Sequence, residues 1–236
     1  MKRISIVGIL LLSVLFTNAQ NPIYYLLVGT YTNTGASEGI YVYRFNPNKT
    51  EVTLMSKTTG VENPSYLTVS KDQKFVYCVN ENTGDKGSVS AFALDKAKGE
   101  LHFLNKQSSG GDAPCFINID DKEKNVIAAN YSGGNFSVFK TNADGTLNPF
   151  VQLIAHQGYG VNVERQEMPH PHAAVFSPDQ KYLFVPDLGN DRLYQYHFNA
   201  TDATNPVTES DPPYYEIPDG SGPRQFIFHP NGKNGQ

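Results

Sequence analysis

The sequence predicts an all-β fold assembled from repeated units, and three observations lead to this prediction. Tyr and Phe occur 14 times each without any Trp, and 20 Gly with 15 Pro provide frequent turns, a composition typical of strands joined by loops. Beyond the first twenty residues, no segment keeps the periodicity of a helix over several turns. A proline-containing segment also returns about every fifty residues, which indicates a repeat architecture.

The repeated segments carry proline at their second position and a strand-like run after it. They cover residues 63–69, 113–119, 170–176 and 222–228. Their third positions, at offsets of 50, 57 and 52 residues, are Ser65, Cys115, His172 and Arg224. In the first three units a polar turn leads to a second apolar strand, at 75–79, 126–129 and 182–185. Each second strand runs into a polar residue fifteen places after the third position, namely Asn80, Asn130 and Asp187.

A third strand then follows a turn rich in Gly or Asp, at 88–94, 135–140 and 192–198, and a weaker fourth strand closes each unit. Four short strands in a unit of about fifty residues are typical of the blades of a β-propeller. The segment 25–30 aligns with 75–80, so the first unit begins at its second strand. We therefore predict a β-propeller of four-stranded blades, with about four blades in this chain.

The end of the chain bears on the completeness of this ring. Residue 236 follows shortly after the first strand of a further unit, whereas closed propellers usually have about four to eight blades. In a closed ring, the C-terminal part would supply the strand that the first unit lacks. We expect residues 20–236 to form an incomplete propeller, either as a fragment or as the product of a frameshifted gene.

The first nineteen residues have the pattern of a secretory signal peptide. Lys2 and Arg3 precede an apolar run at 4–16, and the small residues that end at Ala19 suit cleavage there. The apolar run is too short for a membrane span. We expect the protein to be exported to the periplasm or the extracellular space.

Charge and cysteine content exclude several classes of partner and site. A formal net charge of −4 without long like-sign blocks gives no basic footprint for nucleic acid. Cys78 and Cys115 each lie in an apolar strand-like run, so buried free thiols are favoured over a disulfide, although export would permit one. Neither cysteine has a second ligand at metal spacing. We predict neither a metal nor a cofactor.

The repeat also predicts where polar side chains gather. Blades surround a central channel, so the third-position residues should be spatial equivalents at its mouth, and the polar residues that end the second strands should form another ring. Arg224 offers a fixed bidentate fork for carboxylate or phosphate. His172 can transfer protons near neutral pH. This combination favours a small anionic or carbonyl-rich ligand.

Several motifs add a family resemblance. They are 27–32 with 39–43, then 129–134, His170-Pro171-His172, 187–192 and Gly222-Pro223-Arg224. In combination and order they resemble the lactonase or 6-phosphogluconolactonase propellers, over nearly all of the chain after the signal peptide. The resemblance implies a seven-bladed propeller in the full protein, related to the carboxymuconate cyclases, which opens or forms lactones without a metal.

Site residues are carried over by position. The resemblance makes His172 the channel histidine of the family and Arg224 its first anion-binding arginine. The resemblance also implies a catalytic acid from an Asn-Glu pair about sixteen residues after Arg224, near position 240 and therefore past the last residue. It implies a further arginine in a later blade. Two positions depart from the pattern, because Phe116 and Gln225 stand where the family commonly has histidine. These departures weaken a transfer of the exact substrate.

The resemblance implies hydrolysis of a sugar lactone, as by 6-phosphogluconolactonases, in a protein that we expect to be monomeric when complete. His172 would be the general base or proton shuttle, and Arg224 would bind an anionic group or the developing oxyanion. We expect further substrate contacts from His170, Asp187, Asn130 and Arg192. For each of these four, a structural role in a turn is the alternative. For Arg224 the alternative is an ion pair between blades.

Two other functions stay open. A non-catalytic exported propeller would present its loops to a protein or a glycan, since fold does not determine function. A lactone-forming enzyme similar to carboxymuconate cyclase is the second alternative. Export argues against phosphorylated sugars as substrates, because these are normally kept inside the cell.

Overall fold

The computed structural model describes residues 24–232, and within this range the chain forms strands, turns and loops without an α-helix. The all-β prediction is therefore confirmed. The predicted signal peptide, residues 1–19, lies outside the described residues. Among the residues that are described, no helix is long and apolar enough to cross a membrane.

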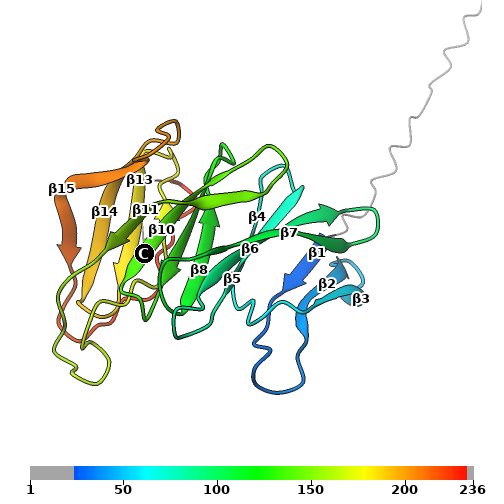
Figure 1. Cartoon of the computed structure of the whole chain (residues 1–236), viewed down its shortest axis with the longest axis horizontal. Helices are drawn as coiled ribbons and strands as arrows, with labels where there is room; N and C mark the ends of the chain where they lie inside the picture. Colours follow the sequence, from blue (N-terminus) through cyan, green and yellow to red (C-terminus); the bar gives the residue numbers. More distant parts are fainter. Residues whose placement is uncertain (1–23, 233–236) are drawn as a thin grey trace, which may run out of the picture.

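The strands form four antiparallel sheets of consecutive strands, which follow one another in chain order across the molecule (Figure 1). Blade 1 consists of β1 Tyr24–Val28, β2 Gly39–Asn46 and β3 Glu51–Thr59. Blade 2 consists of β4 Leu67–Val69, β5 Phe75–Asn80, β6 Ser88–Asp95 and β7 Glu100–Ser108. Blade 3 consists of β8 Pro114–Ile119, β9 Asn125–Asn130, β10 Asn135–Thr141 and β11 Leu147–Ala155. Blade 4 consists of β12 Val175–Phe176, β13 Tyr182–Asp187, β14 Arg192–Phe198 and β15 Val207–Glu216.

Each sheet is a simple meander, as propeller blades are. Blade 1 has three strands in the described residues, in agreement with the prediction that the first unit begins at its second strand. The segment 222–228 that opens the next unit packs on blade 4. There, the ring of Phe184 on β13 lies 5.2 Å from that of Phe226 and 5.5 Å from that of Phe228, measured between centroids.

The turn after the innermost strand is built in the same way in blades 2 to 4. A side-chain oxygen at the first turn position accepts hydrogen bonds from the backbone amides four and five residues later. The acceptors are Ser70, Asp120 and Ser177. The same turns contain one non-glycine residue with positive φ, of 59°, 56° and 57°, at Gln73, Glu123 and Gln180. The three repeat units thus make one turn geometry, because a short side-chain acceptor, Ser or Asp, replaces a backbone partner.

The hydrophobic core lies between the blades rather than within one of them. Successive residues of a strand point to opposite faces, so β5 directs Val76 and Cys78 into a cluster with blade 1. Its alternate residues Tyr77 and Val79 pack into a cluster with blade 3. Both faces of an inner strand are therefore buried, which is why these strands read as continuous apolar runs in the sequence.

Substitution of Phe136 tests this arrangement of the core, because its side chain is 0% exposed between blades 3 and 4. Phe136→Ala leaves a cavity that packed sheets close only in part, and we expect the free energy of unfolding to fall by about 3–5 kcal/mol. Urea denaturation followed by circular dichroism measures the change. Phe103→Ala is the matched control, since Phe103 is 59% exposed. Equal losses in the two variants would contradict the assignment of the core.

Candidate active site

His172 and Arg224, the two predicted catalytic residues, contact each other directly. The guanidinium of Arg224 donates from Nε and Nη2 to Nε2 of His172, at 3.1 and 2.9 Å. Nε2 is therefore an acceptor, and the neutral imidazole carries its proton on Nδ1. This Nδ1 is buried and has no hydrogen-bond partner among residues 24–232.

The surroundings of His172 favour its neutral form. Burial lowers the pKa of His172 below its ordinary value, and the positive charge of Arg224 lowers it further. The residue is 9% exposed, and its ring meets that of Tyr131 in a T-shaped contact with centroids 5.6 Å apart. His172 is consequently unprotonated at pH 7, which is the state that a general base requires.

Cys115 lies beside this pair, as the repeat predicts for a neighbouring third position. Its thiol donates to the backbone carbonyls of Pro171 and His172, with sulfur–oxygen distances of 3.9 and 3.7 Å. Burial raises the pKa of Cys115 to about 12, so the group is a thiol and an unreactive one at neutral pH. Cys78 and Cys115 are both free, as predicted.

Ser65 contacts Glu81, an acidic residue that the sequence analysis did not single out. Its hydroxyl donates to Oε2 of Glu81, and the same oxygen accepts from the phenol of Tyr31 at 2.8 Å. Burial raises the pKa of Tyr31 to about 12 and the bond to Glu81 adds to the shift, so the phenol remains a donor. A signal was present in the sequence: the pair Asn80-Glu81 ends sixteen residues after Ser65, the spacing at which the family resemblance expects an acid after Arg224.

Asp187 is completely buried, and both of its oxygens are engaged. Oδ1 accepts from the backbone amides of His170 and Gly189, at 2.7 and 2.9 Å. Oδ2 pairs with Nδ1 of His156 at 2.6 Å. These contacts hold the backbone of His170 against the end of β13, two residues before the candidate base.

Asn80 and Asn130 make the corresponding connection in blades 2 and 3. Each donates from Nδ2 to a backbone carbonyl just after the outer strand of the preceding blade, at Glu62 (2.7 Å) and Ser109 (3.1 Å). His156 follows β11 in the same way. The ring of polar residues thus connects consecutive blades. Asn130, like Asp187, is 0% exposed, and for both the contact with substrate stays a prediction.

His170 is 4% exposed and lies against Tyr131. Its Nδ1 donates to the backbone carbonyl of Tyr131 at 2.9 Å, and the two rings stack with centroids 4.3 Å apart. Nε2 lies 3.4 Å from a carboxylate oxygen of Glu167. His170 therefore borders the candidate site through Tyr131, and its predicted contact with substrate stays a prediction.

Arg192 lies apart from the catalytic pair. Its guanidinium carbon stands 4.1 Å above the ring centre of Tyr214, and Nη1 donates to the Tyr194 hydroxyl at 3.5 Å. Both tyrosines belong to blade 4, and among the described residues none of the contacts of Arg192 is with His172 or Arg224. A cation–π contact of this kind stabilises the blade, and substrate contact by Arg192 stays a prediction.

Arg165 brings a second positive charge to the site, which sequence reasoning also missed. It comes from the long connection between β11 and β12, and its Nη2 donates to the hydroxyl of Tyr131 at 3.2 Å. Its charge contributes to the lowered pKa of His172, after burial and Arg224. No repeat position marked Arg165, because this connection has no counterpart between the other blades.

Comparison with known proteins assigns the chain to a family. A model of the family described as "Lactonase, 7-bladed beta-propeller" matches residues 25–234. The chain belongs to this lactonase family. A 6-phosphogluconolactonase of Bacillus subtilis is 38% identical over 206 residues, which are 87% of this chain and 56% of that protein. The predicted resemblance and the propeller fold class are confirmed.

Solved structures of lactonase-family proteins agree with this assignment. The periplasmic gluconolactonase of Pseudomonas aeruginosa superimposes with a TM-score of 0.83 at 37% identity, over 91% of this chain and 61% of that one. A Bacteroides fragilis protein provisionally named 6-phosphogluconolactonase gives 0.85 at 45% identity, over 89% and 59%. This lactonase-family chain thus spans between 56% and 61% of the length of these relatives.

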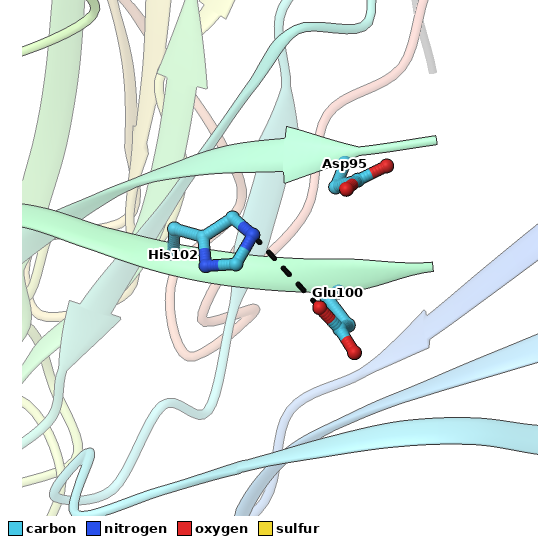
Figure 2. A group of neighbouring side chains, drawn as sticks. All are labelled: Asp95, Glu100 and His102. Carbon is cyan, nitrogen blue, oxygen red and sulfur yellow. Dashed lines mark ion pairs between the residues drawn. The ribbon is translucent and has the colours of Figure 1, made fainter. Parts of the chain in front are cut away.

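One further group of polar side chains lies on the outer edge of blade 2. Asp95 at the end of β6 and Glu100 and His102 on β7 place their ligand-type atoms within 4.8 Å of one another (Figure 2). Oδ1 of Asp95 already accepts from two backbone amides of the β6–β7 hairpin, and His102 is exposed. These contacts are those of a hairpin turn on the surface, and we assign no ligand to the group.

The buried connection at Asp187 is testable by substitution. Asp187→Ala leaves His156 and two backbone amides without their acceptor, and we expect the free energy of unfolding to fall by about 3–5 kcal/mol. Asp187→Asn keeps an acceptor for the amides and should lose less. Thermal and urea unfolding measure both variants, with Asp179→Ala as the control on an exposed turn. If Asp187→Ala unfolds like the wild-type protein, the side chain does not hold the blades together.

Proposed function

We propose that this lactonase-family protein hydrolyses a sugar lactone at the mouth of its channel, with His172 as general base and Arg224 as anion-binding group. The observation that carries the proposal is the contact between a neutral, buried imidazole and a guanidinium, at 2.9 Å. Relatives named 6-phosphogluconolactonase and gluconolactonase support the same chemistry.

The contact between the two side chains suggests how the reaction starts. Arg224 covers the lone pair of His172 Nε2, so this nitrogen accepts no other proton while the contact lasts. A guanidinium binds a negatively charged oxygen more strongly than a neutral imidazole, because charge-assisted hydrogen bonds are about twice as strong as neutral ones. As water attacks, the lactone carbonyl oxygen gains negative charge, so Arg224 would turn to this oxygen and release Nε2 in the same step.

The hydrolysis can then be written as two proton transfers through His172. Water attacks the lactone carbonyl carbon and gives a proton to Nε2 as the new C–O bond forms. Arg224 stabilises the oxyanion on the former carbonyl oxygen. The ring C–O bond then breaks, and Nε2 returns the proton to the leaving alkoxide. The product is a hydroxy acid, which releases its carboxyl proton to water, and its carboxylate remains on the Arg224 fork.

Location and assembly follow from the same proposal. We propose that residues 1–19 direct the protein out of the cytoplasm, since Lys2, Arg3 and the apolar run at 4–16 have the signal-peptide pattern and one relative is a periplasmic gluconolactonase. The two candidate catalytic side chains contact each other within one chain, and so we propose that the complete protein acts as a monomer. Arg165 adds a positive charge that would attract an anionic substrate.

Substitution of the pair tests the enzyme proposal. His172→Ala removes the base, and we expect kcat/KM for glucono-δ-lactone to fall by about 10²–10⁴-fold. Arg224→Ala removes the oxyanion partner, and we expect a loss of about 10²–10³-fold in kcat. A pH-stat assay measures both rates. His102→Ala and Arg44→Ala, on exposed strand positions, are the matched controls.

The outcomes separate the function classes. Full activity in both variants would remove the pair from the mechanism. A wild-type protein that hydrolyses no sugar lactone would favour a non-catalytic propeller that binds a protein or a glycan. Ring closure of the corresponding hydroxy acid, faster than hydrolysis, would favour the lactone-forming alternative.

The pH dependence of the rate follows from the lowered pKa of His172. The reaction requires the unprotonated imidazole, so the acid limb of kcat/KM should lie below the ordinary histidine value of about 6.5. Arg224→Ala removes one of the causes of the shift, and its residual activity should show the limb displaced upwards, towards that value. Rates measured between pH 4 and 9 check both statements. An acid limb above the ordinary value in the wild-type protein would contradict a neutral His172.

A further inference from the structure

A second polar cluster lies beside the catalytic pair in the ring of third-position residues. Glu81 directly follows β5, and its Oε2 accepts the protons of the Ser65 hydroxyl and the Tyr31 phenol. Within residues 24–232 no group donates to Oε1 of Glu81, and the side chain is only partly buried. The cluster therefore offers a ligand one carboxylate oxygen and two oriented hydroxyl groups.

The Cys115 thiol connects this cluster to the catalytic pair. Burial raises the pKa of Cys115, the carboxylate of Glu81 raises it further, and the guanidinium of Arg224 opposes the shift. Blades 2 and 3 also meet at the neighbouring positions: Tyr66 and Phe116, which follow Ser65 and Cys115, have ring centroids 4.6 Å apart. Cys115 also contacts the backbone of His172, at 3.7 Å. The ring thus runs from a carboxylate, past a thiol and an imidazole, to a guanidinium.

This order of groups suits a ligand with two different ends. A carbonyl or carboxylate end matches the guanidinium, which only donates. Alcohol groups are both donors and acceptors, so a hydroxylated chain matches a carboxylate oxygen with two neighbouring hydroxyls. An unsubstituted hydrocarbon chain would remove water from Oε1 of Glu81 without giving this oxygen a hydrogen-bond donor, which is costly.

We propose that Glu81, oriented by Tyr31 and Ser65, binds the hydroxyl groups of a polyhydroxy lactone and of its acid product, while the carbonyl carbon lies at His172 and Arg224. The proposal rests on the lactonase function and specifies its substrate class. Glu81 determines specificity and takes no part in the proton transfers.

The same carboxylate discriminates against phosphate at the hydroxyl end of the ligand. Two like charges a few ångströms apart repel each other, and they do so more strongly where water is excluded. A phosphate on the terminal carbon would approach Glu81 when the carbonyl end is held by Arg224. The cluster therefore favours uncharged sugar lactones over their terminal phosphates.

Binding of product analogues tests the inference without relying on turnover. Gluconate and hexanoate share a carboxylate and a chain of equal length, and only gluconate carries hydroxyls. By isothermal titration calorimetry we expect the wild-type protein to bind gluconate more tightly than hexanoate and more tightly than 6-phosphogluconate. Glu81→Ala should lower the gluconate-to-hexanoate affinity ratio about tenfold, the effect of losing hydrogen bonds to a charged group.

Two further variants complete the experiment. Tyr31→Phe removes one of the donors that orient Glu81 and should lower the same ratio by a smaller factor, which keeps a test available should Glu81→Ala fold poorly. Glu100→Ala is the control, because this carboxylate lies on the outer hairpin of blade 2. We expect its affinity ratio to equal that of the wild-type protein.

The outcomes distinguish this inference from the proposed function. Equal affinities for gluconate and hexanoate in the wild-type protein, or an unchanged ratio in both Glu81→Ala and Tyr31→Phe, would overturn the role of Glu81 even if the protein hydrolyses gluconolactone. A reduced ratio in a protein that hydrolyses no lactone would support the hydroxyl-binding cluster and overturn the proposed lactonase activity.

Discussion

The connection between the second strand of each blade and the end of the blade before it is the interaction on which the rest of the structure depends. Asn80, Asn130 and Asp187 each bond to a residue within three positions of the end of the preceding outer strand. Packing between the blades is apolar and therefore without direction. The polar connection supplies the direction, since it determines where the chain turns inward before each proline segment. The third residues of successive segments then lie close together, as the contacts of Cys115 and Arg224 with His172 show.

The connection is strongest in the blade that carries the candidate base. Blades 2 and 3 use a neutral amide, whereas blade 4 uses a carboxylate that bonds to two backbone amides and to His156. A buried group with several engaged partners is costly to displace. One of those amides belongs to His170, so Asp187 also holds the backbone that leads to His172. Positioning of the base and cohesion of the blades are thus served by the same side chain.

The fold could be predicted from the sequence because its signals are local. Strand runs, turn acceptors such as Ser70 and Ser177, and the proline segments repeat at nearly constant spacing. The meeting of His172 and Arg224 followed from their equivalence in that repeat. The sequence did not predict that the Asp187 side chain points towards the preceding blade. Its partner His156 lies 31 residues earlier in the chain, on a connection that no repeat motif marks. A repeat alignment predicts which residues share a ring, but not which side of the strand each one faces.

Glu81 was missed for a related reason. The repeat draws attention to positions where residues agree, such as the polar end of the second strand, and these turn out to connect the blades. The chemistry lies where equivalent positions differ, because the fold places no demand on them: Ser65, Cys115, His172 and Arg224 at one position, and Glu81, Tyr131 and Leu188 at the other. Such positions are free to acquire charges of opposite sign on different blades. The proposed site combines a carboxylate on blade 2 with a guanidinium after blade 4, and a ligand with unlike ends would bind between them in one orientation.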